Sequence, residues 1–326
     1  MHRPEEIFSI SGPKEFDRLC LQTFRYQYQN NEVYREFCNY LHRDPSQVQE
    51  LEQIPFLPVE FFKSREVVSG NFTPDLVFTS SGTTGQSKSR HLVRDQRLYE
   101  ESFRKGFEFF YGDIRQYTIL ALLPSHLERS GSSLIYMVRD LISQSMDPLS
   151  GFYLHDHKNL LEKLKELQDN QKKILLIGVS YALLDLAQEC YFPLTNAIVM
   201  ETGGMKGRRK EMVREELHRL LKTGLGCENI HSEYGMTELL SQAYARKKGI
   251  FQCPPWMKIL IRDPEDALTY APLNASGGIN VIDLANIYSC SFLATQDLGR
   301  QEHPEKTQIL GRFDNSDIRG CNLLIF

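Results

Sequence analysis

Hydrophobic positions in the first seventy residues recur at helical spacing. The apolar residues of the two successive patterns are Phe16, Leu19, Leu21, Phe24 and Tyr28, then Val33, Phe37 and Leu41. Apolar side chains three and four positions apart share one face of a helix, so both segments are predicted to be helical. Residues 54–59 are predicted to be extended, because each proline in this stretch disfavours helix at the residue before it.

From residue 117 onward, short apolar strands alternate with amphipathic helices. The predicted strands are 117–123, 174–179, 197–200 and 229–232, and the predicted helices are 131–142, 159–173, 181–190 and 212–221. This order predicts a mainly parallel sheet covered by helices on both faces. Ligands of such sheets bind beyond the carboxyl ends of the strands. The Gly-bearing loops after Met200 and Ser232 fall at such ends.

The last eighty residues change character, because strands joined by loops replace the alternating pattern. Strands are predicted at 278–284 and 291–295, and they indicate a small antiparallel sheet near the carboxyl terminus. The sequence therefore predicts an α/β protein in which a helical N-terminal segment, 1–75, wraps a core formed by residues 76–326.

Composition and charge exclude several classes of protein. The chain of 326 residues is 41% hydrophobic and 25% charged, with a formal net charge of −4 and no basic stripe. It is therefore not expected to bind nucleic acid. We predict no membrane span and no signal peptide, since no apolar segment is long enough and none follows the first residues. The seven cysteines are scattered without C-x-x-C spacing, which favours a reducing, cytoplasmic location.

The run from Ser80 to Lys88 is the most informative chemical feature. It follows an apolar strand, 76–79, and contains Ser80, Ser81, Gly82, Thr83, Thr84, Gly85 and Lys88. Glycines allow several backbone N–H groups to face one point, and the hydroxyls and the lysine add donors and positive charge. This composition predicts a phosphate-binding loop rather than a flexible Ser/Gly connection. It differs from the P-loop, because Ser87 stands where that motif has its second glycine.

Three further motifs follow in order: 234–238 (Tyr-Gly-Met-Thr-Glu), 295–300 (Thr-Gln-Asp-Leu-Gly-Arg) and 311–315 (Gly-Arg-Phe-Asp-Asn). Together with the Ser80–Lys88 loop they resemble the motifs of the adenylate-forming superfamily, which includes acyl-CoA synthetases, luciferases and peptide-synthetase adenylation domains. The resemblance spans roughly residues 76 to 320. Ser87 replaces the usual proline of the phosphate loop, and Gln296 replaces the usual glycine before Asp297.

The resemblance implies a role for each motif in binding ATP and Mg²⁺. The loop and Lys88 would hold the β- and γ-phosphates, Thr237 would bind the α-phosphate, and Glu238 would ligate Mg²⁺. The residues implied around the nucleoside are Gly203, Gly204, Tyr234 and Gly235 at the adenine, Asp297 at the ribose hydroxyls, and Arg312 at the ribose or α-phosphate. The alternatives are a first-turn helix acid for Glu238, a turn residue for Asp297 and a core residue for Tyr234.

Within this superfamily the chain looks like the acyl-protein synthetases, which activate fatty acids in bacterial bioluminescence. That likeness implies adenylation of a long-chain fatty or other carboxylic acid, then acyl transfer to a thiol, with Cys321 as the candidate acceptor. His126 is a candidate for the acid pocket. The alternatives are a buried cysteine in a terminal strand for Cys321 and a capping or loop histidine for His126. The superfamily's mobile carboxyl-terminal domain is expected to be absent, since only fourteen residues follow Arg312.

Two alternatives to this function remain open at the level of sequence. One is a ligase that passes the acyl group to coenzyme A or a carrier protein, and the other is a degenerate module that binds acyl-adenylate or nucleotide without turnover. A partner protein that accepts or reduces the acyl group is compatible with the acyl-protein synthetase hypothesis.

Overall fold

The computed structural model of the protein describes residues 4–80, 87–125, 131–203 and 212–312. The chain forms two compact units. One, here called the terminal unit, contains Met1–Thr73 and Pro255–Phe326, and the other, the central unit, contains Pro74–Pro254. The wrapping of residues 1–75 around the rest stays a prediction.

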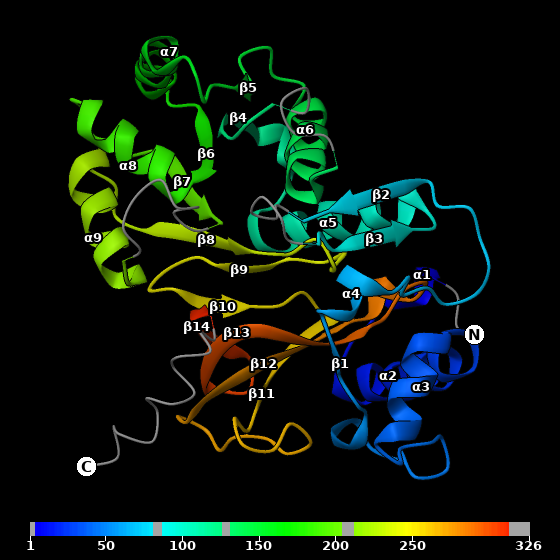
Figure 1. Ribbon diagram of the computed structural model, residues 1–326. Helices are drawn as coiled ribbons and strands as arrows, with labels where there is room; N and C mark the ends of the chain where they lie inside the picture. Colours follow the sequence, from blue (N-terminus) through cyan, green and yellow to red (C-terminus); the bar gives the residue numbers. More distant parts are fainter. Residues whose placement is uncertain (1–3, 81–86, 126–130, 204–211, 313–326) are drawn as a thin grey trace, which may run out of the picture. The chain divides into compact units, whose positions relative to one another are not determined.

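A mainly parallel sheet forms the centre of the central unit (Figure 1). Its strands lie in the order β10–β9–β8–β7–β6–β4–β5. Their bounds are β4 Tyr117–Leu122, β5 Gly151–Phe152, β6 Lys173–Val179, β7 Ala197–Thr202, β8 Ile230–Tyr234, β9 Ala243–Ala245 and β10 Ile250–Gln252. Strands β5, β4, β6, β7 and β8 run parallel, and β9 and β10 continue the sheet antiparallel. The predicted parallel sheet is therefore confirmed.

Helices cover both faces of this sheet, which explains why every residue of β4 is buried. Helices α8 and α9 lie on one face, and α5 and α6 lie on the other (Figure 1). The helices of the unit are α5 Gln96–Tyr111, α6 Ser133–Ser145, α7 His157–Asp169, α8 Ser180–Glu189 and α9 Arg214–Leu225, with the 3-10 turn η2 Ile114–Gln116. The helix predicted to reach Lys173 ends at Asp169, because Gln171 adopts a left-handed backbone with φ 54°.

A separate two-stranded hairpin in the central unit carries the predicted phosphate loop. Strand β2, Leu76–Thr79, pairs antiparallel with β3, Arg90–Val93, and Thr79 lies opposite Arg90. The loop therefore joins two strands. Helix α5 follows β3 directly and begins at the cap Asp95, whose side chain accepts a hydrogen bond from the Arg97 N–H.

An antiparallel sheet forms the core of the terminal unit. Its strands are β11 Met257–Arg262, β12 Ser276–Asp283, β13 Phe292–His303 and β14 Lys306–Arg312, with β1 Leu57–Pro58 parallel to β13. The helices are α1 Pro4–Ile7, α2 Pro13–Asn30, α3 Glu32–Tyr40 and α4 Phe61–Ser64, with the 3-10 turns η1 Leu51–Gln53 and η3 Leu284–Asn286. The predicted antiparallel sheet is confirmed, and it has two strands, β11 and β14, that the pattern did not indicate.

Buried polar contacts join the two sequence segments of the terminal unit. The Gln27 side chain on α2 donates to the carbonyl oxygens of Asn286 (3.1 Å) and Ile287 (3.0 Å), and it accepts from the Ser291 N–H (2.9 Å). These bonds satisfy backbone groups around η3 that the sheet leaves unpaired. Among the described residues, no helix is long and apolar enough to cross a membrane.

Candidate nucleotide site

The ends of the predicted phosphate loop are held together by a pair of serines. The Ser80 N–H donates to the Ser89 carbonyl (3.1 Å), and the Ser89 N–H donates to the Ser80 hydroxyl (2.9 Å). Lys88 is exposed and directly precedes this closing pair. The structure therefore brings Ser80 and Lys88 to the same end of the hairpin. The loop residues Ser81, Gly82, Thr83, Thr84 and Gly85 lie outside the described residues.

The loops after β7 and β8 lie side by side, as the parallel order predicts. Thr202 pairs in register with Glu233, and the Thr202 hydroxyl donates to the Glu233 carboxyl at 2.5 Å. Gly203 directly follows Thr202 beyond the end of β7, and Tyr234 directly follows Glu233 as the last residue of β8. Gly203 is exposed and has a φ of 58°, a left-handed conformation that glycine adopts without steric cost.

The Tyr234–Glu238 motif continues beyond the end of β8. A Cβ atom on Gly235 would lie 2.6 Å from the Glu233 carboxyl oxygen, so the close approach of that carboxyl requires glycine. Tyr234 is half-buried, and its ring meets the Phe251 ring edge to face, with centroids 6.1 Å apart. Glu238 is buried and lies in a turn, so its interpretation as a first-turn helix acid is wrong.

His91 connects the hairpin to this motif. It lies on β3, is 1% exposed, and its Nδ1 is 2.8 Å from the Thr237 carbonyl oxygen. A carbonyl oxygen only accepts hydrogen bonds, so Nδ1 carries the proton. The sequence offered no role for His91, because its partner lies 146 positions away in the chain.

Buried acidic residues support the strand ends beneath the motif. Burial, together with the neighbouring Glu201 charge, raises the pKa of the Glu233 carboxyl to about 7, although the Thr202 hydrogen bond acts in the opposite direction. Burial favours a higher pKa for Glu201 as well. The His218 side chain and the charge of Arg214 outweigh this effect, so the pKa of Glu201 lies below the ordinary value. These carboxyls were missed at the level of sequence, since a polar residue in a strand gives no sign of its burial.

Glu201 joins the end of β7 to helix α9. Its Oε1 lies 3.3 Å from Arg214 Nε and 3.6 Å from His218 Nε2. The Ser180 hydroxyl, at the start of α8, donates to the Gly203 carbonyl at 3.3 Å. The backbone that leads into the Gly203 loop is therefore fixed from both α8 and α9. Gly204, the second glycine of the predicted pair, lies outside the described residues.

Asp297 and Arg312 lie opposite each other in the terminal unit. Asp297 pairs in register with Arg312 across β13 and β14, and Arg312 Nε is 3.6 Å from the Asp297 carboxyl. Asp297 is 9% exposed and lies inside a strand, so its interpretation as a turn residue is wrong. The structure thus brings together Asp297, predicted to bind the ribose hydroxyls, and Arg312, predicted to reach the ribose or the α-phosphate. His126 and Cys321 lie outside the described residues.

A magnesium ion that arrives with a nucleotide needs few ligands from the protein. Within the described ranges, no group of three His, Cys, Asp or Glu residues could hold a metal ion by itself. Mg²⁺ in nucleotide sites is bound by one or two carboxylates together with phosphate oxygens and water. One carboxylate, that of Glu238, is compatible with such a site.

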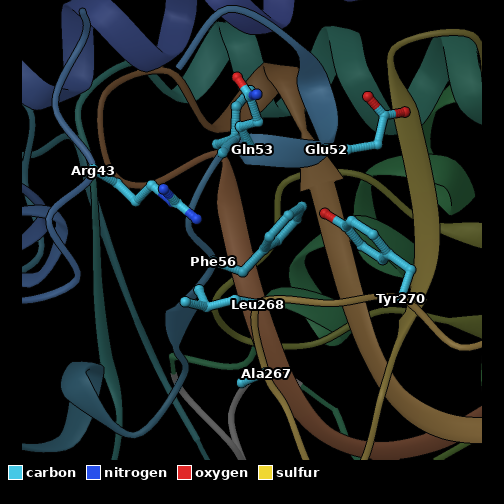
Figure 2. A pocket seen from close by; sticks show the side chains of 8 residues that line it. Arg43, Glu52, Gln53, Phe56, Ala267, Leu268 and Tyr270 are labelled. Carbon is cyan, nitrogen blue, oxygen red and sulfur yellow. The ribbon is translucent and has the colours of Figure 1, made fainter. Parts of the chain in front are cut away.

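A small pocket of about 120 Å³ lies in the terminal unit, and none of the residues that line it is a predicted site residue. Figure 2 shows the Arg43 and Tyr270 side chains pointing toward Phe56 from opposite sides. Burial and the neighbouring Glu52 charge raise the Tyr270 pKa. Ligand pockets for drug-sized molecules usually measure about 300–1,000 Å³. This pocket is therefore too small for ATP.

The chain is similar in sequence to proteins of one known family. The family profile "Acyl-protein synthetase, LuxE" matches residues 8–325. The long-chain-fatty-acid–luciferin-component ligase of Vibrio harveyi is 25% identical, over 99% of this chain and 90% of its own length. The Aliivibrio fischeri ligase of the same name is 23% identical, over 99% and 91%.

Solved structures of ligases share the fold. A 2-hydroxyisobutyryl-CoA ligase in complex with 2-HIB-AMP and CoA aligns with a TM-score of 0.66 and 14% identity, covering 94% of this chain and 77% of that one. ATP-bound MatB from Rhodopseudomonas palustris aligns with a TM-score of 0.55 and 19% identity, covering 74% and 49%. At these identities the likeness concerns the fold, and it confirms the predicted α/β architecture of adenylate-forming cores.

Proposed function

Because this chain belongs to the acyl-protein synthetase, LuxE family, we propose that it is an ATP- and Mg²⁺-dependent ligase for a carboxylic acid. The acid is a long-chain fatty acid, by analogy with the substrate in the names of the Vibrio and Aliivibrio ligases. The enzyme forms acyl-AMP and pyrophosphate, then passes the acyl group to a thiol. Family membership supports the reaction class, and the arrangement of the central unit supports the site.

The observation that carries the proposal is the meeting of three motif-bearing segments in the central unit. Tyr234 is the last residue of β8, and Gly203 directly follows the neighbouring strand β7, whose Thr202 pairs with Glu233. The Thr237 carbonyl accepts a hydrogen bond from His91, which lies on β3, the strand that follows the Ser80–Lys88 loop. Phosphate, adenine and metal contacts would thus come from adjacent loops of one sheet and one hairpin.

The first half-reaction is an in-line displacement at the α-phosphorus. A carboxylate oxygen of the acid forms the new bond to phosphorus, and the bond to the pyrophosphate oxygen breaks. Lys88 and the loop donate to the leaving phosphates, and Thr237 donates to the α-phosphate oxygen whose charge grows. Bound Mg²⁺, held by Glu238, would neutralise phosphate charge. Positioning and charge neutralisation account for the catalysis, and no protein nucleophile is needed.

The second half-reaction transfers the acyl group to sulfur. A thiolate attacks the acyl carbonyl carbon, the bond to the AMP oxygen breaks, and a thioester and AMP result. We propose Cys321 as the acceptor, because the family resemblance points to a cysteine near the carboxyl end. A protein that then accepts or reduces the acyl group would be the partner of this enzyme.

Acid-dependent ATP–pyrophosphate exchange tests the adenylation step. The assay compares fatty, aryl and amino acids in the presence of Mg²⁺. We expect exchange with fatty acids, and a loss on the order of 100-fold or more in Lys88→Ala and Glu238→Ala. Lys105→Ala serves as the control, since Lys105 pairs with Glu101 on the exposed face of α5. ATP binding without exchange for any acid would instead favour the binding module.

Acyl transfer is tested with a radiolabelled fatty acid. Under ATP and Mg²⁺ the wild-type chain should acquire label that hydroxylamine removes, as expected of a thioester. Cys321→Ser should retain exchange and lose this label, whereas Cys253→Ser should keep both. Thioester formation on added coenzyme A that is unaffected in Cys321→Ser would favour the coenzyme A ligase.

A further inference from the structure

An arginine at the end of β11 connects three neighbouring strands of the terminal unit. Arg262 Nη1 donates to the Ile279 carbonyl (2.7 Å) and to Asn280 Oδ1 (3.0 Å), both on β12. Its Nη2 donates to the Thr295 carbonyl on β13 at 2.7 Å. The guanidinium therefore reaches across β12 and binds backbone oxygens on two strands at once.

Two glycines make room for Arg262, Gly278 beside its guanidinium and Gly277 beside its backbone carbonyl. A Cβ atom on Gly278 would lie 2.3 Å from Arg262 Cζ, and a Cβ on Gly277 would lie 2.1 Å from the Arg262 carbonyl oxygen. The β12–β13 register shifts between Gly278 and Asn280, and Ile279 falls at this irregularity. The guanidinium supplies a donor to the Ile279 carbonyl where the regular ladder is interrupted.

A short series of hydrogen bonds leads from this contact to Asp297. The Thr295 hydroxyl donates to the same Ile279 carbonyl (3.1 Å) and accepts from the Asp297 N–H (3.1 Å). Thr295 and Asp297 lie two residues apart in β13 and share its buried face. Arg262 thus fixes the carbonyl of Thr295, and the Thr295 hydroxyl fixes the backbone of Asp297.

We propose that Arg262 is the positioning residue for ribose recognition, because it holds Thr295, and through it the carboxylate of Asp297, in place for the two ribose hydroxyls. This inference rests on the proposed function and on the role that the superfamily resemblance implies for Asp297, which is to bind the ribose hydroxyls. Arg262 itself does not contact the nucleotide. A planar guanidinium is suited to the task, since its rigid fork serves acceptors on both strands, which one ammonium group cannot span.

The discriminating measurement is a ratio of affinities, not an activity. Isothermal titration calorimetry on the full chain gives the dissociation constants of ATP and of 2′,3′-dideoxy-ATP. Hydrogen bonds to a carboxylate predict that the wild-type chain prefers ATP by on the order of tenfold or more. We expect Arg262→Lys to reduce this preference to within about twofold, chiefly by weakening the binding of ATP.

A second pair of variants keeps the test valid where Arg262→Lys does not fold. Thr295→Val removes the hydroxyl at nearly constant shape and should also reduce the preference, whereas Thr295→Ser keeps the hydroxyl and should preserve it. Arg65→Lys is the matched control, since Arg65 lies elsewhere in the terminal unit and forms an exposed ion pair with Glu36 at 3.0 Å. It should leave the ratio unchanged.

The outcomes separate a positioning role from a structural one. The proposal would be overturned if Arg262→Lys and Thr295→Val lowered the thermal stability but left the ratio of the dissociation constants of 2′,3′-dideoxy-ATP and ATP unchanged. An unchanged ratio in Asp297→Ala would overturn it at its first step, because Asp297 would then not bind the ribose. Adenylation itself would still be decided by the exchange assay.

Discussion

The two units hold their predicted site residues in different ways. In the central unit, Gly203 and Tyr234 stand just beyond or at the carboxyl ends of parallel strands. In the terminal unit, Asp297 and Arg312 lie within antiparallel strands, directly opposite each other. A loop at a strand end is held in place by a few side-chain contacts. A residue inside a strand is held in place by the pairing register of the whole sheet.

This difference has consequences for substitution. A change in a central-unit loop removes a functional group and leaves the sheet intact, so the rate should fall while the fold persists. A change near Asp297 disturbs cross-strand contacts, so nucleotide affinity and folding stability should fall together. The predictions that follow separate these two behaviours.

The largest effect is expected at Thr237 in the central unit. Thr237→Val removes the hydroxyl predicted to bind the α-phosphate and leaves the carbonyl that His91 binds. Loss of one donor to the developing charge should lower the exchange rate on the order of 100-fold to 1,000-fold. Thr237→Ser keeps the hydroxyl and should stay within about tenfold of wild type. A melting temperature that falls by more than about 5 °C in Thr237→Val would contradict the expectation that a change in this loop lowers the rate while the fold persists.

In the terminal unit, Gly278→Ala should destabilise the fold. Its Cβ would collide with the Arg262 guanidinium, so the arginine must leave its acceptors or the strands must separate. We expect a loss on the order of 3 kcal/mol in urea unfolding, together with weaker ATP binding. Gly12→Ala is the control, because nothing lies within 4 Å of a Cβ there and its backbone is extended. Equal stability of the two variants would contradict the assigned role of Arg262.

The hydrophobic pattern predicted most of the fold, but it did not indicate several short or polar strands in either unit. Long apolar runs such as 174–179 identify buried strands, and they became β6 and its neighbours. Strand β14 is polar at most positions, and β9 and β10 have only three residues each, so their periodicity carries little signal. Helix α5 does have helical spacing, at Tyr99, Phe103 and Phe107, and its pattern predicts a helix.

The candidate site was predicted where local sequence determines it. The Tyr234–Glu238 motif and the Ser80–Lys88 loop are each a short run of residues, so the sequence alone identifies them. The anchors that fix those residues are not local, since Arg262 meets Thr295 at a separation of 33 positions and His91 meets Thr237 at 146. Such contacts depend on sheet register, which one sequence does not encode in any short window.

Glu233 gives the central unit a stability that depends on pH. Its pKa is raised from the ordinary 4.5 to about 7 in the folded protein, because burial favours the neutral form. A raised pKa stabilises the fold below pH 4.5, and this stabilisation is lost as the pH rises through 7. Glu233→Gln should therefore gain on the order of 2 kcal/mol relative to wild type between pH 5 and pH 7.

Urea unfolding of both proteins at pH 5, 6, 7 and 8 measures this difference. The neighbouring His231, whose pKa burial lowers to about 4, has the opposite dependence but is present in both proteins, so its contribution largely cancels. A constant difference between the two proteins across the series would show that Glu233 keeps an ordinary pKa. Asp140→Asn, at a partly buried ion pair with Arg104, is the control for removing a carboxylate elsewhere in the unit.

The smallest effect is expected at His91, which acts on the Tyr234–Glu238 motif only through the Thr237 backbone. His91→Leu leaves the Thr237 carbonyl without this donor and should lower exchange about tenfold, because an unmade buried hydrogen bond costs about 1–3 kcal/mol. His91→Asn places an amide N–H close to the position of Nδ1 and should restore most of the rate. If both variants lose the same activity, the volume of the ring matters and the hydrogen bond does not. Recovery in His91→Asn alone would show that a loop of the parallel sheet depends on one backbone contact, whereas the terminal sheet depends on its whole register.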